Sequence, residues 1–598
     1  MSNPTNRRRD PGGLSSEAIL IWIAVILVVL VVGSIYAAMH LGHRFAGTGI
    51  EIPVDPFSVV FGLLAGDLVW PGAAGWWVLG GSLAAILALG GLIGLMLRKR
   101  GRRSSRVDRA ASYMGRGRDV EDLSRKSAAT KAQRLGVTGA PGVPIGRTVA
   151  AGQPLYGSWE DMHIDIWGPR TGKTTSRAVP AILDAPGSVL VTSNKRDVVD
   201  ATRDVRATAG PVWVFDPQAI ALENPTWWWN PLSYVTDEVR AAKLAEHFAT
   251  GSRDPAAKTD AYFDPAGQDL LAGLLLAAAL DHRPITDVYT WLTRPTDETA
   301  VDILREHDFA LTADQVAGVV SAPDKQRGGI YGTAMQMASC LTNRQVAQWV
   351  TPKGAADPRP QFRPEEFERA DGGTLYSLSK EGRGTAGPLV TALTVAVVEA
   401  AEELAARSAG GRLTTPLLGV LDEAANVCRW RALPDLYSHY GSRGIVLMTI
   451  LQSWSQGVEV WGESGMKKLW SAANVKVYGG GVSEAAFLED LSRLVGDYDR
   501  LSSSTSSSRG QRTVSQQLHR ERILDVADLG AMPKGRALVL SSGSRPTLIR
   551  TIPWMTGPHA SAVKASIAAH DPQAQHTLGT AQQELAAVEA FIGTEEAS

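Results

Sequence analysis

Two long apolar runs, at residues 18–39 and 75–97, dominate the hydropathy pattern near the start of the chain. Neither contains a charged residue, and the 22 residues of the first, at about 1.5 Å each, make a helix of roughly 33 Å, enough to cross a bilayer core. Trp76 and Trp77 open the second run, where interfacial tryptophans are expected. The alternative for the first run is a cleaved signal peptide, but the run is longer than a signal core and lacks a clear small-x-small cleavage site. The pattern predicts two transmembrane helices in a membrane anchor over residues 18–97.

The distribution of basic residues around these runs predicts their orientation. Arg7–Arg9 precede the first run and six Lys or Arg residues directly follow the second, whereas residues 40–74 contain only Arg44 among Lys and Arg. By the positive-inside rule, residues 1–17 and everything after the second run lie in the cytoplasm, and a short loop faces outward. Residues 98–145 form a basic linker. Contact with nucleic acid is one use for it, but a topology signal beside anionic lipid is the preferred interpretation.

Beyond residue 145 the pattern changes to short β-branched runs separated by helical stretches. Each run is nearly continuous in apolar residues rather than alternating, which is typical of strands in a buried parallel sheet covered by helices. The pattern therefore predicts an α/β fold. The predicted strands are residues 163–168, 188–193, 211–216, 373–379, 416–422, 444–450, 475–480 and 535–540.

Residues 236–365 interrupt this alternation, because strand signals disappear there and helix signals accumulate. The first helix is predicted to take its N-cap from the Thr236–Asp237 pair and to end at Gly251. The next, in DPAGQDLLAGLLLAAALDH, is predicted to have Asp264 as N-cap and Pro265 at its first helical position. Its apolar core of about a dozen residues favours a buried helix over a third span. The block is interpreted as an all-α domain inserted into the α/β domain.

Two segments lack a core-forming pattern. The Ser-rich stretch LSSSTSSSRGQRTVSQQ, residues 501–517, is of low complexity and is predicted to be a mobile loop. The tail at residues 561–598 has a helical pattern near AQQELAAVEAFI. It is interpreted as a docking tail or a frayed end, and the frayed end is preferred.

Composition adds limited constraints. The chain has 598 residues, about four domains' worth, with 44% hydrophobic residues and a net charge of −1. No overall charge therefore argues for nucleic-acid binding, although local charge still matters. The two cysteines, Cys340 and Cys428, argue against a disulfide framework or a zinc cluster, and for a reducing compartment.

The stretch WGPRTGKTTS, residues 167–176, resembles a phosphate-binding loop that is one residue short. The usual pattern is G-x-x-x-x-G-K-[ST]; here Trp167 stands where the first glycine belongs, and Gly168 comes one residue late. A predicted strand precedes the loop and a predicted helix, KTTSRAVPAILDA, follows it, so backbone N–H groups and the helix dipole would point at phosphates. Lys173 would neutralise β/γ-phosphate charge and Thr174 would hold Mg²⁺.

Phosphate contacts are expected from the N–H groups of residues 170–174, with Gly168 replacing the missing glycine in a tighter turn. Trp167 is expected to pack against the sheet or the base. The residues predicted to bind nucleotide are Gly168, Pro169, Arg170, Thr171, Gly172, Lys173, Thr174 and Thr175.

The stretch PLLGVLDEAAN supplies the second half of this chemistry. Asp422 and Glu423 stand at the carboxyl end of a buried strand, the edge where an open α/β sheet binds its ligand. Burying two adjacent acids is costly unless they serve a cation or a reaction. Asp422 would hold Mg²⁺ and Glu423 would orient and deprotonate the attacking water. The alternative is that Asp422 only caps the following helix.

Further polar residues follow neighbouring strands. Gln452 ends the strand in GIVLMTILQ and is placed to sense the γ-phosphate. Arg443 precedes that strand and, in a ring, would reach a neighbour's nucleotide as an arginine finger; the alternative is a surface arginine. The run Asn194–Asp197 follows another strand and either binds nucleotide or lines a pore.

Together these features resemble the conjugative coupling proteins of type IV secretion systems, the TraG/TraD-type membrane ATPases. The resemblance covers roughly residues 15–560 and rests on the two apolar runs, GPRTGKTT, VLVTSNKRD, PLLGVLDEAAN and RGIVLMTILQSWSQ, with the helical block between the phosphate loop and the acidic strand. It implies a P-loop (RecA-like) ATPase domain with an inserted all-α domain and two N-terminal transmembrane helices. Trp167 and the position of Arg443 depart from the family pattern.

The resemblance also implies a function. It implies a homo-hexameric ring at the inner membrane that uses ATP and Mg²⁺ to pass single-stranded DNA, with its attached relaxase, into the secretion channel. The all-α domain is implied to recognise the DNA-processing complex. Two alternatives stay open: an FtsK-type translocase of double-stranded DNA, and a cargo receptor for protein secretion with little turnover.

The predicted organisation follows from these boundaries. It comprises a cytoplasmic N-terminus at 1–17, the anchor at 18–97, the linker at 98–145, the first part of the ATPase domain at 146–235, the all-α domain at 236–365, the second part of the ATPase domain at 366–560 and the tail at 561–598.

Overall fold

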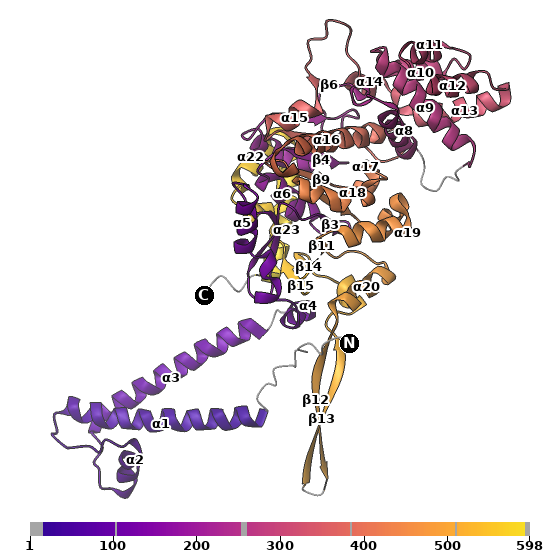
Figure 1. Ribbon diagram of the computed structural model, residues 1–598. Coiled ribbons are helices and arrows are strands. Elements are labelled where there is room, and N and C mark those ends of the chain that lie inside the picture. The colour runs from indigo at the N-terminus through magenta and orange to yellow at the C-terminus, as the bar shows by residue number, and fades with distance from the viewer. Residues whose placement is uncertain (1–15, 102–104, 253–259, 383–384, 509–510, 593–598) are drawn as a thin grey trace. The chain divides into compact units, whose positions relative to one another are not determined.

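The computed structural model describes residues 16–101, 105–252, 260–382, 385–508 and 511–592. The chain divides into two compact units (Figure 1). The small unit contains the N-terminal helices and residues 497–522. The large unit contains residues 107–496 and 523–590.

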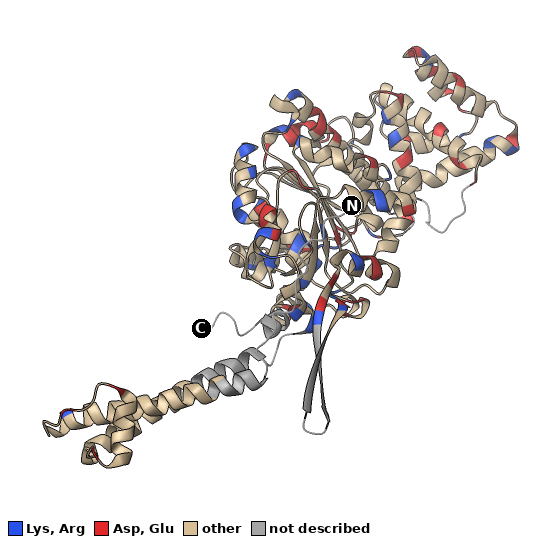
Figure 2. Ribbon diagram, turned by 60° about the horizontal axis from the view of Figure 1, so that its bottom comes forward, with Lys and Arg blue, Asp and Glu red and all other residues tan. Residues whose placement is uncertain are grey.

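Three helices form the first part of the small unit. They are α1 (Ser16–Ala46), α2 (Pro56–Ala65) and α3 (Gly72–Gly101), and α1 packs against both others. Each predicted span lies inside one of these helices. Among the described residues, three helical stretches are long and apolar enough to cross a membrane, namely Ala24–Ala46, Gly72–Gly91 and Phe263–Leu280. The described parts of α1 to α3 carry few charged residues (Figure 2).

Residues 497–522 form an antiparallel hairpin of β12 (Asp497–Ser508) and β13 (Gln511–Arg522). The prediction of a mobile loop at 501–517 is therefore wrong for the described part of that stretch. Low complexity does not prevent a backbone ladder, and the register places Leu501 opposite Leu518. Pairs between charged side chains reinforce the base of the ladder: Arg520–Asp497 at 2.7 Å and Arg500–Glu521 at 3.2 Å.

An eleven-stranded sheet organises the large unit, in the order β2-β1-β15-β14-β11-β3-β10-β9-β4-β8-β5. The strands from β11 to β5 are mutually parallel, as predicted, whereas β14, β15, β1 and β2 continue the sheet antiparallel. All eight predicted strands are confirmed. The strands are β1 (Val143–Thr148), β2 (Pro154–Gly157), β3 (His163–Ile166), β4 (Val189–Ser193), β5 (Val212–Phe215), β8 (Thr374–Leu378), β9 (Leu417–Leu421), β10 (Ile445–Leu451), β11 (Val475–Tyr478), β14 (Arg536–Ser541) and β15 (Thr547–Arg550).

Helices cover both faces of this sheet. One face packs against α5 (Arg125–Arg134), α6 (Val179–Asp184), α7 (Asp197–Arg206) and α22 (Ala560–His570) in a continuous apolar core. The long helix α16 (Gly387–Arg407) contacts β4, β8 and β10. The other helices of the core are α15 (Pro364–Ala370), α17 (Ala424–Val427), α18 (Leu433–Tyr440), α19 (Trp454–Ala472), α20 (Ala485–Val495) and α21 (Val526–Gly530), with α4 (Arg106–Ala110) at the start.

The helical block predicted within residues 236–365 begins at α8 (Glu238–Ser252), and Asp237 caps it by accepting the Arg240 N–H at 2.9 Å. The predicted cap of the next helix is wrong. Asp260, not Asp264, accepts the N–H of Phe263 at 2.9 Å, so α9 begins at Phe263. The block continues through α9 (Phe263–Leu280), α10 (Thr286–Leu292), α11 (Thr299–Glu306), α12 (Ala310–Val320), α13 (Asp324–Met337) and α14 (Arg344–Val350), and the short strands β6 (Trp228–Trp229) and β7 (Gln361–Phe362) pair at its base.

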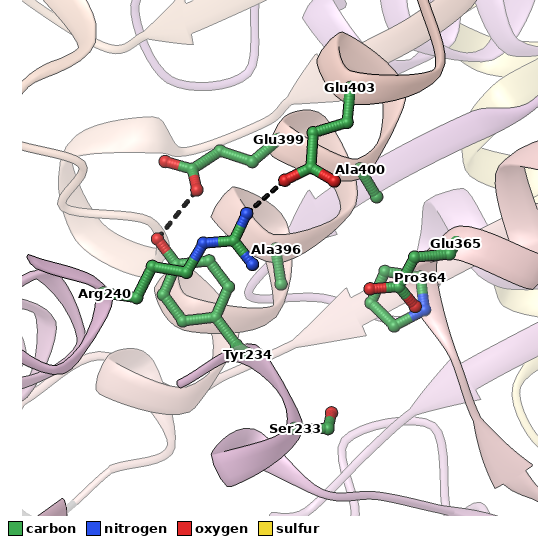
Figure 3. A pocket seen from close by; sticks show the side chains of 9 residues that line it. All are labelled: Ser233, Tyr234, Arg240, Pro364, Glu365, Ala396, Glu399, Ala400 and Glu403. Atoms are coloured by element: carbon green, nitrogen blue, oxygen red, sulfur yellow. Dashed lines mark hydrogen bonds and ion pairs between the residues drawn. The ribbon is translucent and has the colours of Figure 1, made fainter. Parts of the chain in front are cut away.

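Part of the contact between this block and the core is a charged cluster that joins α8 and the preceding Tyr234 to α16 (Figure 3). The Arg240 guanidinium lies 5.4 Å from the centre of the Tyr234 ring and forms an ion pair with Glu403. The Tyr234 hydroxyl donates to Glu399 at 2.8 Å, and Lys243 approaches the same carboxylate at 2.8 Å. Arg240, Tyr234, Glu399 and Glu403 also line a hollow of about 290 Å³, and because these four groups pair with one another they form a structural contact.

The tail is folded. Its helices are α22 and α23 (Ala574–Ile592), and α22 packs against α7. The Ser566 hydroxyl donates to the carbonyl of Asp200 at 2.6 Å, and Arg196 donates to the carbonyl of His570 at 2.6 Å. The preference for a frayed end is therefore wrong for residues 560–586. Of the two interpretations, the docking tail is the one that the structure supports, because apolar residues of α22 and α23 pack into the core.

Candidate nucleotide site

The shortened loop is tied into the sheet at its front end. The Trp167 N–H donates to the carbonyl of Leu451 and the Gly168 N–H donates to that of Gly480, both at 2.9 Å. A Cβ on Gly168 would lie 2.0 Å from the carbonyl oxygen of Gly481, so only glycine fits there. The N–H of Gly168 is consequently engaged by the protein, and its role is to allow this close approach.

Trp167 belongs to the core rather than to a base-binding surface. Its side chain is 1% exposed and packs with Val475 and Val477 of β11. A Cβ on Gly479 would lie 2.1 Å from the Trp167 ring, so the indole rests directly on that backbone. Of the two predicted roles, packing against the sheet is the one observed.

The loop then turns through two left-handed positions, Arg170 at φ 59° and Gly172 at φ 91°. Its exit is a π-turn at Thr174–Ala178, in which the Val179 N–H donates to the carbonyl of Thr174, before α6 begins. Pro180, which has no N–H to donate, is the second residue of α6. The strand, the loop and the helix thus stand in the predicted order, and residues 170–174 lie at the helix N-terminus, the end of a helix at which backbone N–H groups can bind an anion.

Beneath the loop lies a buried ion pair that the sequence pattern did not reveal. Arg177 and Asp165 are both 0% exposed, with Arg177 Nη2 3.0 Å from Asp165 Oδ2. Arg177 also contacts His163 Nδ1 at 3.3 Å. Burial and the charge of Arg177 lower the pKa of His163 well below its ordinary value, so the ring is neutral. The pair fastens the turn after the phosphate loop to β3.

The acidic pair meets Lys173 at the carboxyl end of the sheet. Lys173 Nζ lies 3.1 Å from Asp422 Oδ1 and forms an ion pair with Glu423. Gln452, at the end of β10, donates its amide to both carboxylate oxygens of Glu423, at 2.7 and 2.8 Å. Four of the predicted residues are therefore brought together in one buried cluster.

Two details bear on the roles of the acids. Glu423 adopts a left-handed backbone at φ 55°, a strained conformation for a residue with a side chain and one that is common at functional sites. Glu423, and not Asp422, stands at the N-cap of α17, and its side chain makes no capping bond. The capping interpretation of Asp422 therefore has no support.

The predicted magnesium ligands are Thr174 and Asp422. Among the described residues, no group of three or more His, Cys, Asp or Glu is arranged to hold a metal. One hydroxyl and one carboxylate are nevertheless the partial shell that Mg²⁺ completes with water and phosphate oxygens. Asp422 Oδ1 is buried and in this structure already faces one cation, Lys173 Nζ, at 3.1 Å.

Burial raises the pKa of Asp422 to about 6 from its ordinary value of 3.8, with Lys173 opposing the shift. Between these two pH values the Asp422 carboxyl is protonated in the folded protein but not in the unfolded protein. The stability that this protonation contributes is lost as the pH rises through about 6. We expect the melting temperature of Asp422→Asn, relative to that of the unmodified protein, to rise between pH 4.5 and 7. Thermal unfolding across this range checks it; parallel curves for the two proteins would contradict the assignment.

Two residues of the run Asn194–Asp197 have different environments. Burial raises the pKa of Asp197, and its charge acts on Lys173 and Asp422, so it belongs to the electrostatics of the site. Arg196 instead pairs with Asp200 at 2.5 Å and binds the tail.

Glu381, which the sequence interpretation missed, accepts hydrogen bonds from Asn194 at 2.6 Å and Asn426 at 2.8 Å. It stands shortly after β8, and its position just beyond a buried strand was the available signal.

Arg443 lies away from this cluster. Arg443 precedes β10 and Gln452 follows it, so the two residues stand at opposite ends of that strand. Arg443 contacts His439 at 3.0 Å and Glu402 at 3.4 Å. The structure of one chain therefore gives it no contact with its own nucleotide site, and a finger role toward a neighbouring subunit stays a prediction.

Comparison with known proteins identifies one segment. Residues 416–534 match the family described as the TraM recognition site of TraD and TraG. This segment contains both acids and Gln452. No characterised protein in the curated comparison matches the chain by sequence.

Several solved structures resemble the chain at low identity. The unbound bacterial conjugative coupling protein TrwBdeltaN70 shares 16% identity at a TM-score of 0.48, over 71% of this chain and 92% of that one. The plasmid coupling protein TrwB with the ATP analogue ADPNP gives the same four values. VirB4 of Thermoanaerobacter pseudethanolicus shares 13% identity at a TM-score of 0.40, over 70% of this chain and 98% of that one.

Proposed function

We propose that this chain, a member of the TraG/TraD-type coupling-protein family through residues 416–534, is a membrane-anchored ATPase that delivers DNA to a type IV secretion channel. Its substrate is single-stranded DNA carrying a relaxase, and ATP hydrolysis drives the translocation. The observation that carries the proposal is the cluster in which Lys173 from the phosphate loop meets Asp422, Glu423 and Gln452 from two adjacent strand ends.

In the proposed mechanism, Lys173 exchanges its carboxylate partners for the phosphates of ATP. In this structure Lys173 is held by the two carboxylates, which outweigh the effect of burial and raise its pKa, so the amine is charged. When a triphosphate enters the loop, Lys173 turns to the β/γ-phosphates and releases Glu423. Glu423, still oriented by Gln452, then accepts the proton of the attacking water. Thr174 and Asp422 would hold Mg²⁺, which would supply positive charge to neutralise the phosphates.

The remaining features fit a membrane-anchored ring. Helices α1 and α3 are long and apolar enough to anchor the protein, with basic residues on the cytoplasmic side. In a homo-hexamer, the edge of the sheet that carries Arg443 would face the nucleotide of the next subunit. The helical block of α8 to α14 and the surface of residues 416–534 are the proposed contacts for relaxosome proteins and channel components.

The test is ATP hydrolysis by the full-length protein in detergent or liposomes. We expect turnover that single-stranded DNA stimulates more than duplex DNA of equal length, and a loss of at least about 10²-fold in Lys173→Ala, which removes a phosphate-stabilising charge. Stronger stimulation by duplex DNA would instead favour an FtsK-type translocase. Nucleotide binding without turnover would favour a cargo receptor.

A further inference from the structure

A hollow of about 350 Å³, open to solvent, lies beside the phosphate loop. Residues 170–172 and 175–176 of the loop form one wall. Residues that follow β15, including Pro553 and Met555, form a second wall, and Glu584 and Leu585 of α23 form a third. Asp422, Glu423 and Gln452 are not among its lining residues.

Helix α23 is held in place by apolar packing against the core. Ala574, Leu578 and Ala581 follow one another at helical spacing and pack into the apolar core that contains Ala178 and Ile182, the residues just after the phosphate loop. Leu585 stands four residues beyond Ala581, on the same face, and is half-buried at the hollow. The docking face of α23 therefore continues into the hollow.

The direction of a bound triphosphate follows from the cluster already described. Lys173 and the acidic pair take its γ-end, because the reacting water must lie beside Glu423. Thr175 and Ser176, one and two residues past Thr174, open onto the hollow. The nucleoside end of the ligand consequently points into it.

The lining has the chemistry of a nucleoside site. Pro553, Met555 and Leu585 offer apolar surface for the flat face of a purine. Glu584, Lys534 and Thr551 offer polar groups for its edge or for the ribose. Burial raises the pKa of Glu584 while Lys534 lowers it, so the two side chains already influence one another.

We propose that α23 forms one wall of the nucleoside subsite, with Leu585 packing against the purine and Glu584 facing its polar edge. The tail thereby becomes part of the ATP site, and any partner that pulls α23 away weakens ATP binding. This inference rests on the proposed nucleotide-binding function.

The test compares ATP with inorganic triphosphate, which has no nucleoside. Full-length Leu585→Asp places a charge against the apolar face, and we expect its Kd for ATP to rise about tenfold while its Kd for triphosphate changes less than about twofold. Glu584→Gln keeps the side-chain volume and is expected to raise the Kd for ATP about threefold. Gln583→Ala, at an exposed position of the same helix, is the matched control and should bind both ligands normally.

The outcomes separate the two proposals. Loss of ATP affinity alone in Leu585→Asp supports the subsite. Unchanged affinity for both ligands, or equal weakening of both, overturns it, because α23 would then be absent from the site or would only support the loop. If the unmodified protein binds neither ATP nor triphosphate, the proposed function itself fails. Should Leu585→Asp fold poorly by circular dichroism, Leu585→Ala gives the same comparison with a smaller change.

Discussion

ATP turnover by the full-length Glu423→Gln variant is expected to fall by about 10²–10⁴-fold, while ATP binding persists. The amide fills the same volume and stays beside Gln452, but it cannot accept a proton from water. Lys173 keeps Asp422 as an ionic partner at 3.1 Å, so the phosphate loop retains its charge.

The measurement is steady-state hydrolysis together with the Kd for ATP. Glu463→Gln makes a matched control, because Glu463 has a side chain that is 66% exposed on α19 and the same charge is removed away from the site. Hydrolysis at the unmodified rate in Glu423→Gln would remove Glu423 from the mechanism. Loss of binding together with turnover would make it a structural residue instead.

The second large effect concerns stability. Arg177→Met is expected to lower the free energy of unfolding by about 3–5 kcal/mol, because it leaves the fully buried carboxylate of Asp165 without its cation. Burial already raises the pKa of Asp165, and Arg177 opposes that shift. Loss of the pair also frees the turn after the phosphate loop, so ATP affinity should fall too.

Thermal or denaturant unfolding checks this prediction. The double variant Asp165→Asn with Arg177→Met removes both charges and is expected to recover much of the loss, as a double-mutant cycle would reveal. Arg134→Ala, which breaks a pair whose Arg134 side chain is 66% exposed, should cost no more than about 1 kcal/mol. Similar losses in Arg177→Met and Arg134→Ala would contradict a special role for the buried pair.

Much of the fold was predictable because its strands are continuous apolar runs. The runs that contain β9 and β10 are almost entirely apolar until their carboxyl ends. The run that contains β3 includes His163 and Asp165 but leads directly into the phosphate-loop motif. Both the strands and the edge that carries chemistry could therefore be found. Strands β1, β2 and β15 were not predicted from the sequence because they are short and include proline, glycine or charged residues. The hairpin of β12 and β13 was not predicted because a Ser-rich composition gives little information about backbone pairing.

By itself, the amino-acid sequence determined the apolar helices, the order of the strands along the chain and the identities of Lys173, Asp422, Glu423 and Gln452, since each follows from local pattern and spacing. Only the tertiary structure decided which of these meet. Lys173 reaches residues about 250 positions away because parallel strands share one edge. Trp167 lies on the backbone of Gly479, Arg177 is buried against Asp165, and Leu585 lines the same hollow as residues of the phosphate loop. Each of these contacts depends on close packing between segments distant in sequence, and no local periodicity encodes it.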